Sequence, residues 1–330
     1  MTRLLEVKDL KVSFQNGKNI FTGISGVDFH VNTGEILSIV GESGSGKSIT
    51  TLSLMGLLGK TGKADAESIR FDNEELKGKS EKELDKIRGS KMTMIFQDAL
   101  TSLNPVFTIG NQMTEAILSH TNLNRKEASE RAANLLTKVG LSDAVALLKK
   151  YPHTLSGGMR QRVMIAMALA CNPKLLIADE PTTALDVTIQ AQIMDLLKSI
   201  NKEFDMSIIL ITHDMGVVAE TADRVLVMYA GEVVEEAFVK DLFSHPGHPY
   251  TRALLRSIPG AGGQEELLIP IEGSVPENYD KLTGCRFLNR CPHAGEECRT
   301  KQELSEIAEG HSVRCIKYNE LNQVIDRVDA

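Results

Sequence analysis

The stretch ILSIVGESGSGKSITTLSLMGLL, residues 36–58, decides the fold of this chain. A short apolar run, a glycine-rich loop and a segment with helical spacing of apolar residues follow one another, which predicts strand, loop and helix. The loop at 41–48 fits the pattern G-x-x-x-x-G-K-S. In such a loop, backbone N–H groups and the positive end of the helix hold phosphate. The sequence therefore predicts a site for a nucleoside triphosphate with Mg²⁺.

The residues of this loop have distinct predicted roles. Lys47 reaches the β- and γ-phosphate oxygens, and the hydroxyl of Ser48 binds Mg²⁺. A glycine-rich turn that binds nothing is the alternative, but the flanking strand and helix favour a phosphate site. A dinucleotide site would need G-x-G-x-x-G, which this loop does not fit. The predicted nucleotide-binding residues are Gly41, Ser43, Gly44, Ser45, Gly46, Lys47, Ser48 and Ile49.

Two further apolar runs end in residues that suit phosphate chemistry. KLLIADEP, residues 174–181, places Asp179 and Glu180 at the end of a strand, where a parallel sheet presents residues to a ligand. We expect Asp179 to hold Mg²⁺ and Glu180 to orient or deprotonate an attacking water. His213 follows the run SIILIT and is expected to contact the γ-phosphate. The alternatives are a solvated acidic turn and a structural histidine.

A second glycine-rich turn, LSGG at 155–158, opens another predicted helix. One nucleotide already has its phosphates held by residues 41–48, so this turn needs its own explanation. Either it binds the same nucleotide from elsewhere, or Ser156 only caps the helix, since serine is a favoured N-cap residue. The residues concerned are Ser156, Gly157 and Gly158.

The order of the elements predicts an α/β fold with a mostly parallel sheet covered on both faces. Strands are expected at 4–14, 36–40, 91–96, 174–178, 206–212 and 224–230. The segments QMTEAILSH and KEASERAANLLTKV read as amphipathic helices inserted into this fold. We predict an ATP-binding core at 1–97 and 156–240, a helical subdomain at 98–155, and a separate C-terminal piece at 241–330.

The composition of the chain limits the classes of partner that it can bind. Its 330 residues carry a net charge of −7, which argues against a nucleic-acid partner, because such binding needs a basic face. The charged N-terminal segment MTRLLEVKDLKVSF does not resemble a signal peptide, and no apolar run is long enough to span a membrane. We expect a cytosolic protein whose association with a membrane is peripheral.

Taken in order, these motifs resemble those of the ATP-binding subunit of an ABC transporter, over residues 1 to about 240. The resemblance implies that two ATPase subunits, identical or homologous, pair head to tail. The LSGG segment of each then closes over ATP held by the other. It also implies that Gln97, at the end of KMTMIFQ, senses Mg²⁺ and acts in catalysis, that Phe14 stacks on adenine, and that the helical segment grips two transmembrane permease subunits.

Three segments are similar to the subfamily that imports dipeptides and oligopeptides: FQDALTSLNP (96–105), YPHTLSGGMRQR (151–162) and HPYTRALL (248–255). This similarity implies an extracytoplasmic peptide-binding protein and a position at the cytoplasmic face of the membrane. Nickel importers share the architecture, so the substrate stays open. A soluble ABC-type ATPase acting on nucleic acid or ribosomes, and a nucleotide-binding regulator, are the other functions considered.

Four of the five cysteines lie in the C-terminal piece with the spacing C-x₅-C-x₆-C-x₁₆-C: Cys285, Cys291, Cys298 and Cys315. A reducing cytosol disfavours disulfides. Zinc remains an alternative, although the spacing lacks the C-x₂₋₄-C knuckles of structural zinc sites, and free thiols remain another. A [4Fe–4S] cluster takes four thiolates, and the resemblance to peptide importers also implies one. Each of these cysteines adjoins an arginine, and these arginines either offset the negative charge of such a cluster or are solvated. We assign Cys171 to the core.

Overall fold

The protein is described here by a computed structural model covering residues 2–97, 102–183, 185–257 and 271–319. The chain divides into two compact units. The first contains Met1–Thr2, Val31–Ile36 and Gly78–Ile211, and the second contains Arg3–His30, Leu37–Lys77 and Thr212–Ala330. The predicted helical subdomain, the FQDALTSLNP segment and the predicted C-terminal piece each include residues outside the described ranges.

The first unit is built on three parallel strands with β8 in the middle. The strands are β7 (Met92–Ile95), β8 (Leu175–Asp179) and β9 (Ser207–Thr212). Every residue of β8 and β9 is buried, as expected for strands covered on both faces. The helices are α2 (Glu81–Leu84), α4 (Ile109–His120), α5 (Arg125–Lys138), α6 (Ala144–Leu147), η1 (Pro152–Thr154), α7 (Gly157–Ala168) and α8 (Val187–Phe204).

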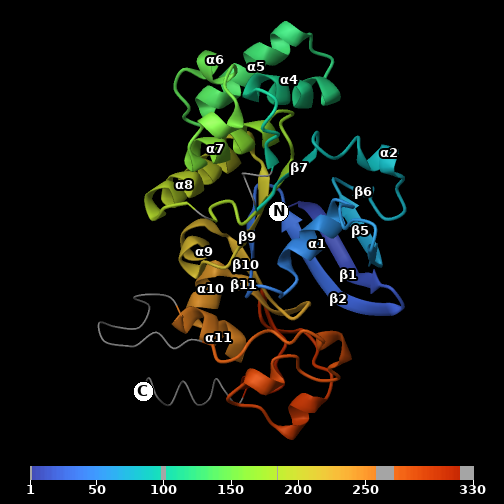
Figure 1. Ribbon diagram of the computed structural model, residues 1–330. Helices are drawn as coiled ribbons and strands as arrows, with labels where there is room; N and C mark the ends of the chain where they lie inside the picture. The colour runs from blue at the N-terminus through green and yellow to red at the C-terminus, as the bar shows by residue number, and fades with distance from the viewer. Residues whose placement is uncertain (1, 98–101, 184, 258–270, 320–330) are drawn as a thin grey trace. The chain divides into compact units, whose positions relative to one another are not determined.

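Local sequence explains where the helices between β7 and β8 begin. Thr108 caps α4 by accepting a hydrogen bond from the N–H of Asn111, and Asn124 forms a capping box with Glu127 at the start of α5. Each helix buries one face only, because its apolar residues recur at helical spacing. Figure 1 shows α4, α5 and α6 gathered beside α7.

The second unit contains a mixed sheet in the order β3-β10-β11-β13-β12. β3 and β10 are parallel, and the other neighbours are antiparallel. The strands are β3 (Ile36–Val40), β10 (Arg224–Tyr229), β11 (Glu232–Phe238), β12 (Ser305–Ala308) and β13 (His311–Val313). Its helices are α1 (Lys47–Leu54), α9 (Met215–Thr221), α10 (Val239–Ser244), α11 (Pro249–Arg256), η2 (Tyr279–Lys281), η3 (Leu288–Arg290) and η4 (Glu296–Arg299).

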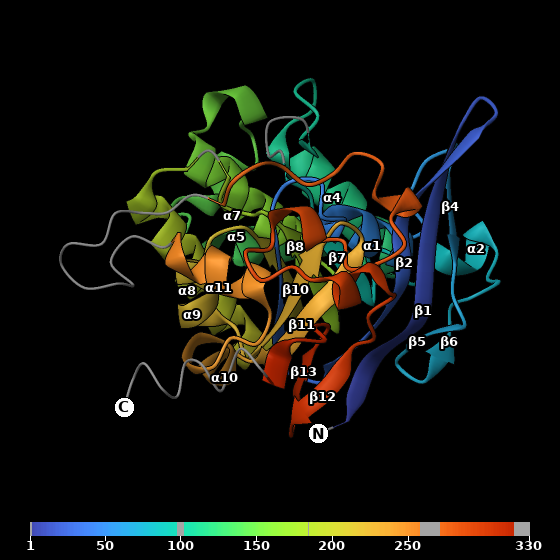
Figure 2. The same cartoon turned by 90° about the horizontal axis from the view of Figure 1, so that it is seen from below.

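A second sheet of this unit is antiparallel, with the order β2-β1-β5-β6 and with β4 also paired to β1 (Figure 2). Its strands are β1 (Arg3–Asn16), β2 (Asn19–Asn32), β4 (Gly62–Asp65), β5 (Ser68–Phe71) and β6 (Glu74–Glu75). The prediction of one mostly parallel sheet was therefore incomplete. Both long strands mix buried and exposed positions, which is typical of a sheet covered on one face.

All six predicted strands are confirmed within one or two residues of their expected ends. The described residues of the predicted C-terminal piece share a core with other parts of the second unit. Phe287 packs against Tyr229 and Tyr250, with ring centroids 5.2 and 5.4 Å away. Among the described residues, no helix is both long enough and apolar enough to cross a bilayer.

Candidate functional site

The loop 41–48 connects β3 to α1, as its sequence predicts. Gly41, Gly44 and Gly46 have φ angles of 151, 81 and 104°, a region that side chains with a Cβ rarely adopt. A Cβ on Gly41 would lie 2.2 Å from the carbonyl oxygen of Met228, and one on Gly46 would lie 2.5 Å from Ile24. The glycines therefore permit both the turn and its close packing.

Lys47 is the first residue of α1 and lies across the loop. Its Nζ donates hydrogen bonds to the carbonyl oxygens of Gly41, at 2.7 Å, and Glu42, at 3.0 Å. The residue is only 6% exposed. The ammonium is thus held within the loop that the sequence assigns to phosphate.

The remaining predicted residues of the loop and of the adenine contact lie in the same unit. The hydroxyl of Ser45 is buried and has no hydrogen-bond partner among the described residues, while Ser43 and Gly44 are exposed. Ser48 and Ile49 are half-buried on the first turn of α1. Phe14 is half-buried on β1. A Cβ built on Gly23 would lie 3.2 Å from the Phe14 ring and 3.7 Å from the Ile49 side chain.

The predicted catalytic carboxylate lies in the first unit. Asp179 is buried at the end of β8, and Glu180 follows it with φ 45°, a strained conformation for a residue with a side chain. The Glu180 carboxylate accepts hydrogen bonds from Gln97 Nε2, at 2.8 Å, and from Thr183 Oγ1, at 2.9 Å. The structure thus brings Gln97 and Glu180 together, and Thr183 is a contact that the sequence did not indicate.

His213 lies in the second unit, directly after β9, and its side chain is exposed. The next residue, Asp214, caps α9 by accepting hydrogen bonds from the N–H groups of Gly216 and Val217. The histidine is therefore held between the end of a strand and the start of a helix.

The LSGG segment forms the N-terminus of α7 in the first unit. Ser156 is the N-cap and accepts a hydrogen bond from the N–H of Met159, at 3.3 Å. Ser156 and Gly157 are exposed, and a Cβ on Gly158 would lie 2.9 Å from Ile189 of α8. The capping role considered from sequence is confirmed, and the same exposed helix start suits an anion.

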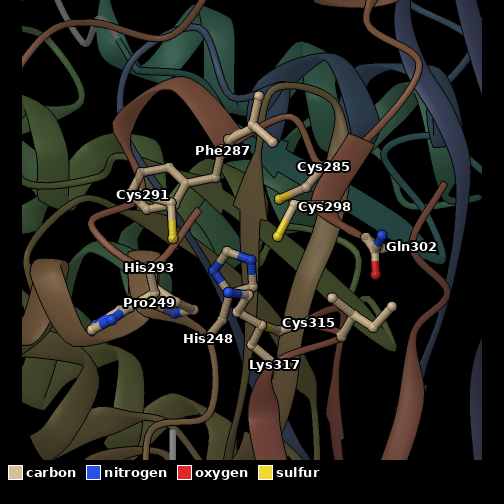
Figure 3. A pocket seen from close by; sticks show the side chains of 12 residues that line it. His248, Pro249, Cys285, Phe287, Cys291, His293, Cys298, Gln302, Cys315 and Lys317 are labelled. Carbon is tan, nitrogen blue, oxygen red and sulfur yellow. The ribbon is translucent and has the colours of Figure 1, made fainter. Parts of the chain in front are cut away.

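The four C-terminal cysteines line one pocket (Figure 3). The pocket encloses about 360 Å³, including its open mouth, and His248, Phe287 and His293 also line it. In Figure 3 the sulfur atoms of Cys285 and Cys298 point into the pocket from one side and that of Cys291 from the other. The backbone N–H of Cys285 also donates to the carbonyl oxygen of Cys298, at 2.8 Å, which ties two of these residues together.

Burial makes three of these thiols less acidic. It raises the pKa of Cys285 and of Cys315 to about 11, and it raises the pKa of Cys291 as well. Within the described ranges, no group of three or more His, Cys, Asp and Glu side chains is placed to hold a metal ion. Cys171 is half-buried just after α7, so its assignment to the core was wrong.

The start of the loop contacts residues far along the chain that the sequence did not indicate. The N–H of Glu42 donates to the hydroxyl of Tyr250, at 2.8 Å. The Glu42 carboxylate receives two hydrogen bonds from Arg290, at 2.6 and 3.0 Å, and this pairing raises the pKa of Arg290 above its ordinary value. The only feature of the sequence that singled out Arg290 was its position beside a cysteine.

Two protein families match the chain. Residues 24–183 match the family described as ABC transporter, and residues 234–298 match the family described as oligopeptide/dipeptide transporter, C-terminal region. The second match includes three of the four pocket cysteines, Cys285, Cys291 and Cys298.

Characterised relatives and solved structures extend this similarity. The chain is 55% identical to the oligopeptide transport ATP-binding protein AppD of Bacillus subtilis, over 97% of this chain and 98% of the relative. It is 48% identical to the dipeptide transport ATP-binding protein DppD of Escherichia coli, over 94% and 96%. Among solved structures, the chain is similar to the ATP-binding cassette MJ0796 in a dimeric post-hydrolysis state bound to ADP and Pi. The two sequences are 32% identical and the TM-score is 0.63, with 71% of this chain and 98% of that chain covered.

Proposed function

Because the chain belongs to the family of ATP-binding proteins of oligopeptide and dipeptide ABC transporters, we propose that it hydrolyses ATP to drive the import of such peptides across a membrane. The observation that carries this function is the 55% identity to an oligopeptide transport protein over 97% of the chain, C-terminal region included. The fold is that of an ABC-type P-loop ATPase. The inserted helices and the cysteine-containing extension are its proposed additional parts.

The proposed mechanism assigns each group a physical role. Gly41 and residues 43–49 bind the triphosphate, with Lys47 on its β- and γ-oxygens. Ser48, Gln97 and Asp179 would hold Mg²⁺, which would offset the negative charge of the phosphate oxygens. Glu180 orients or deprotonates the attacking water, because Gln97 and Thr183 hold its carboxylate in place. His213 contacts the γ-phosphate, and Phe14 stacks on adenine.

The proposed assembly is a head-to-tail pair of ATPase subunits bound to two permease subunits at the cytoplasmic face of the membrane. The exposed N-terminus of α7 supports it, since a second anion-binding helix start is explained if Ser156, Gly157 and Gly158 close over the ATP of a partner subunit. ATP binding closes the pair and hydrolysis reopens it. An extracytoplasmic binding protein delivers the peptide.

Co-purification tests this assembly and its substrate together. We expect the affinity-tagged chain to retain two permease subunits and a second ATPase subunit, identified by mass spectrometry. ATP turnover by that complex should rise when a binding protein loaded with a dipeptide or oligopeptide is added. Stimulation by nickel but not by peptides would contradict the peptide assignment and favour a nickel importer.

For the cysteine pocket we propose a [4Fe–4S] cluster held by Cys285, Cys291, Cys298 and Cys315, with a structural or regulatory role. Four thiols from residues 285–315 line one cavity, which suits a cofactor. A single zinc ion needs all its thiolates about 2.3 Å from one point, whereas a cluster takes its four cysteines around a larger volume.

Replacing Cys291 with serine should remove most of the bound iron and sulfide, because the cluster loses one of its four thiolates. The measurement is iron and sulfide content, with visible absorption, after anaerobic purification. Cys171→Ser is the matched control, since Cys171 is a half-buried cysteine that does not line the pocket, and its iron content should equal that of the wild type. Stoichiometric zinc without iron in the wild type, or unchanged iron in Cys291→Ser, would contradict the proposal.

A further inference from the structure

The phosphate loop carries an acidic side chain that its function does not call for. Glu42 is the second residue of the loop, and its carbonyl oxygen accepts a hydrogen bond from the Lys47 ammonium at 3.0 Å. A Glu42 carboxylate without a counter-charge would repel the triphosphate, because like charges brought close together disfavour binding. The loop therefore needs a counter-charge for Glu42.

Arg290 supplies this counter-charge from 248 residues further along the chain. Its Nη1 and Nη2 bind the two Glu42 oxygens at 2.6 and 3.0 Å, a two-pronged arrangement that suits a guanidinium and a carboxylate. The Arg290 side chain is 6% exposed and that of Glu42 is 28% exposed, so water screens this pair only in part.

The C-terminal segment fixes the Arg290 side chain in place. Its Nε donates to the carbonyl oxygen of Glu272 at 2.7 Å, and its Nη groups also contact the hydroxyl of Tyr229 and the carbonyl oxygens of Ile271 and Gly273, each at 3.3 Å. Every nitrogen of the guanidinium thus has an acceptor. These contacts hold the side chain against the loop.

We propose that Arg290 is a positioning residue for the ATPase reaction: it neutralises Glu42 and thereby sets the affinity of the phosphate loop for ATP. The inference rests on ATP binding at residues 41–48. It makes the C-terminal segment part of the nucleotide site. Since Arg290 directly precedes Cys291, the same segment links the cysteine pocket to the loop.

The test is a set of ATP dissociation constants measured by calorimetry on the purified full-length chain. We expect Arg290→Gln to bind ATP about tenfold more weakly, a change of roughly 1.4 kcal/mol. Glu42→Gln should bind at least as tightly as the wild type, and the double variant should recover to within about threefold, because no unpaired carboxylate remains. The loss in Arg290→Gln should shrink in about 1 M salt, where charges are screened beyond roughly 3 Å.

Two variants separate charge from structural support. Arg290→Lys keeps the positive charge but loses the two-pronged contact, so we expect affinity within about threefold of the wild type even if Arg290→Gln does not fold. Arg299→Gln is the matched control, because Arg299 also adjoins a cysteine but is exposed and pairs with Glu296. A double variant as weak as Arg290→Gln, or Arg290→Lys about tenfold weaker than the wild type, would overturn the inference. Absence of ATP binding by the wild type would instead refute the nucleotide site.

Discussion

Lys47→Ala is expected to lower ATP turnover by about a hundredfold or more and to weaken nucleotide binding, because the positive charge held against the β- and γ-phosphates disappears. Lys47 is buried and bonded to two carbonyl oxygens of its own loop, so a positioned charge is lost, and no neighbouring lysine of the loop can replace it. The measurements are steady-state ATPase activity and the ATP dissociation constant.

The control for this variant is Lys63→Ala, which removes an exposed lysine of β4 in the same unit. Its activity should match the wild type. Thermal unfolding of both variants checks that the fold is intact. Wild-type turnover in Lys47→Ala would refute the assignment of residues 41–48 as the phosphate site.

Glu180→Gln is expected to retain ATP binding while hydrolysis falls by about a hundredfold or more, the contribution typical of a general base. Glutamine has nearly the size of glutamate and can still contact Gln97 and Thr183, so the local structure should persist. What is lost is the negative charge that orients or deprotonates water. The ATP-bound pair of subunits should therefore accumulate.

Size-exclusion chromatography with ATP, Mg²⁺ and the partner ATPase subunit measures this accumulation, alongside single-turnover hydrolysis. Glu203→Gln, at an exposed carboxylate near the end of α8, is the control and should behave as the wild type. A Glu180→Gln variant that hydrolyses ATP at the wild-type rate, or that stays monomeric under these conditions, would count against the role of Glu180.

The phosphate loop could be predicted because its information is local. Three glycines at fixed spacing encode the left-handed turns of the loop, and the apolar runs on either side encode β3 and α1. The other buried strands were predictable for the same reason, since continuous apolar runs are typical of strands covered on both faces.

The contacts that connect distant parts of the chain could not be predicted in this way. No sequence pattern indicates that residue 285 contacts residue 298, or that residue 42 contacts residue 290. Such long-range contacts depend on the whole packed structure. The antiparallel sheet was missed, although its strand β1 was predicted, because its short strands β4, β5 and β6 contain few apolar residues. The packing of Phe287 against Tyr229 and Tyr250 is likewise a long-range contact that the sequence did not indicate. It places part of the predicted C-terminal piece in the core of the second unit.

The central claim is that this chain converts ATP hydrolysis into peptide import, and uptake by the complete transporter tests it most directly. The permeases, both ATPase subunits and the binding protein are reconstituted in vesicles with the ATPase side facing the ATP, and a labelled dipeptide or oligopeptide is supplied on the other side. We predict uptake that requires ATP and Mg²⁺ and that is lost when this chain carries Glu180→Gln. Peptide uptake at the same rate without ATP or with that variant would contradict the claim.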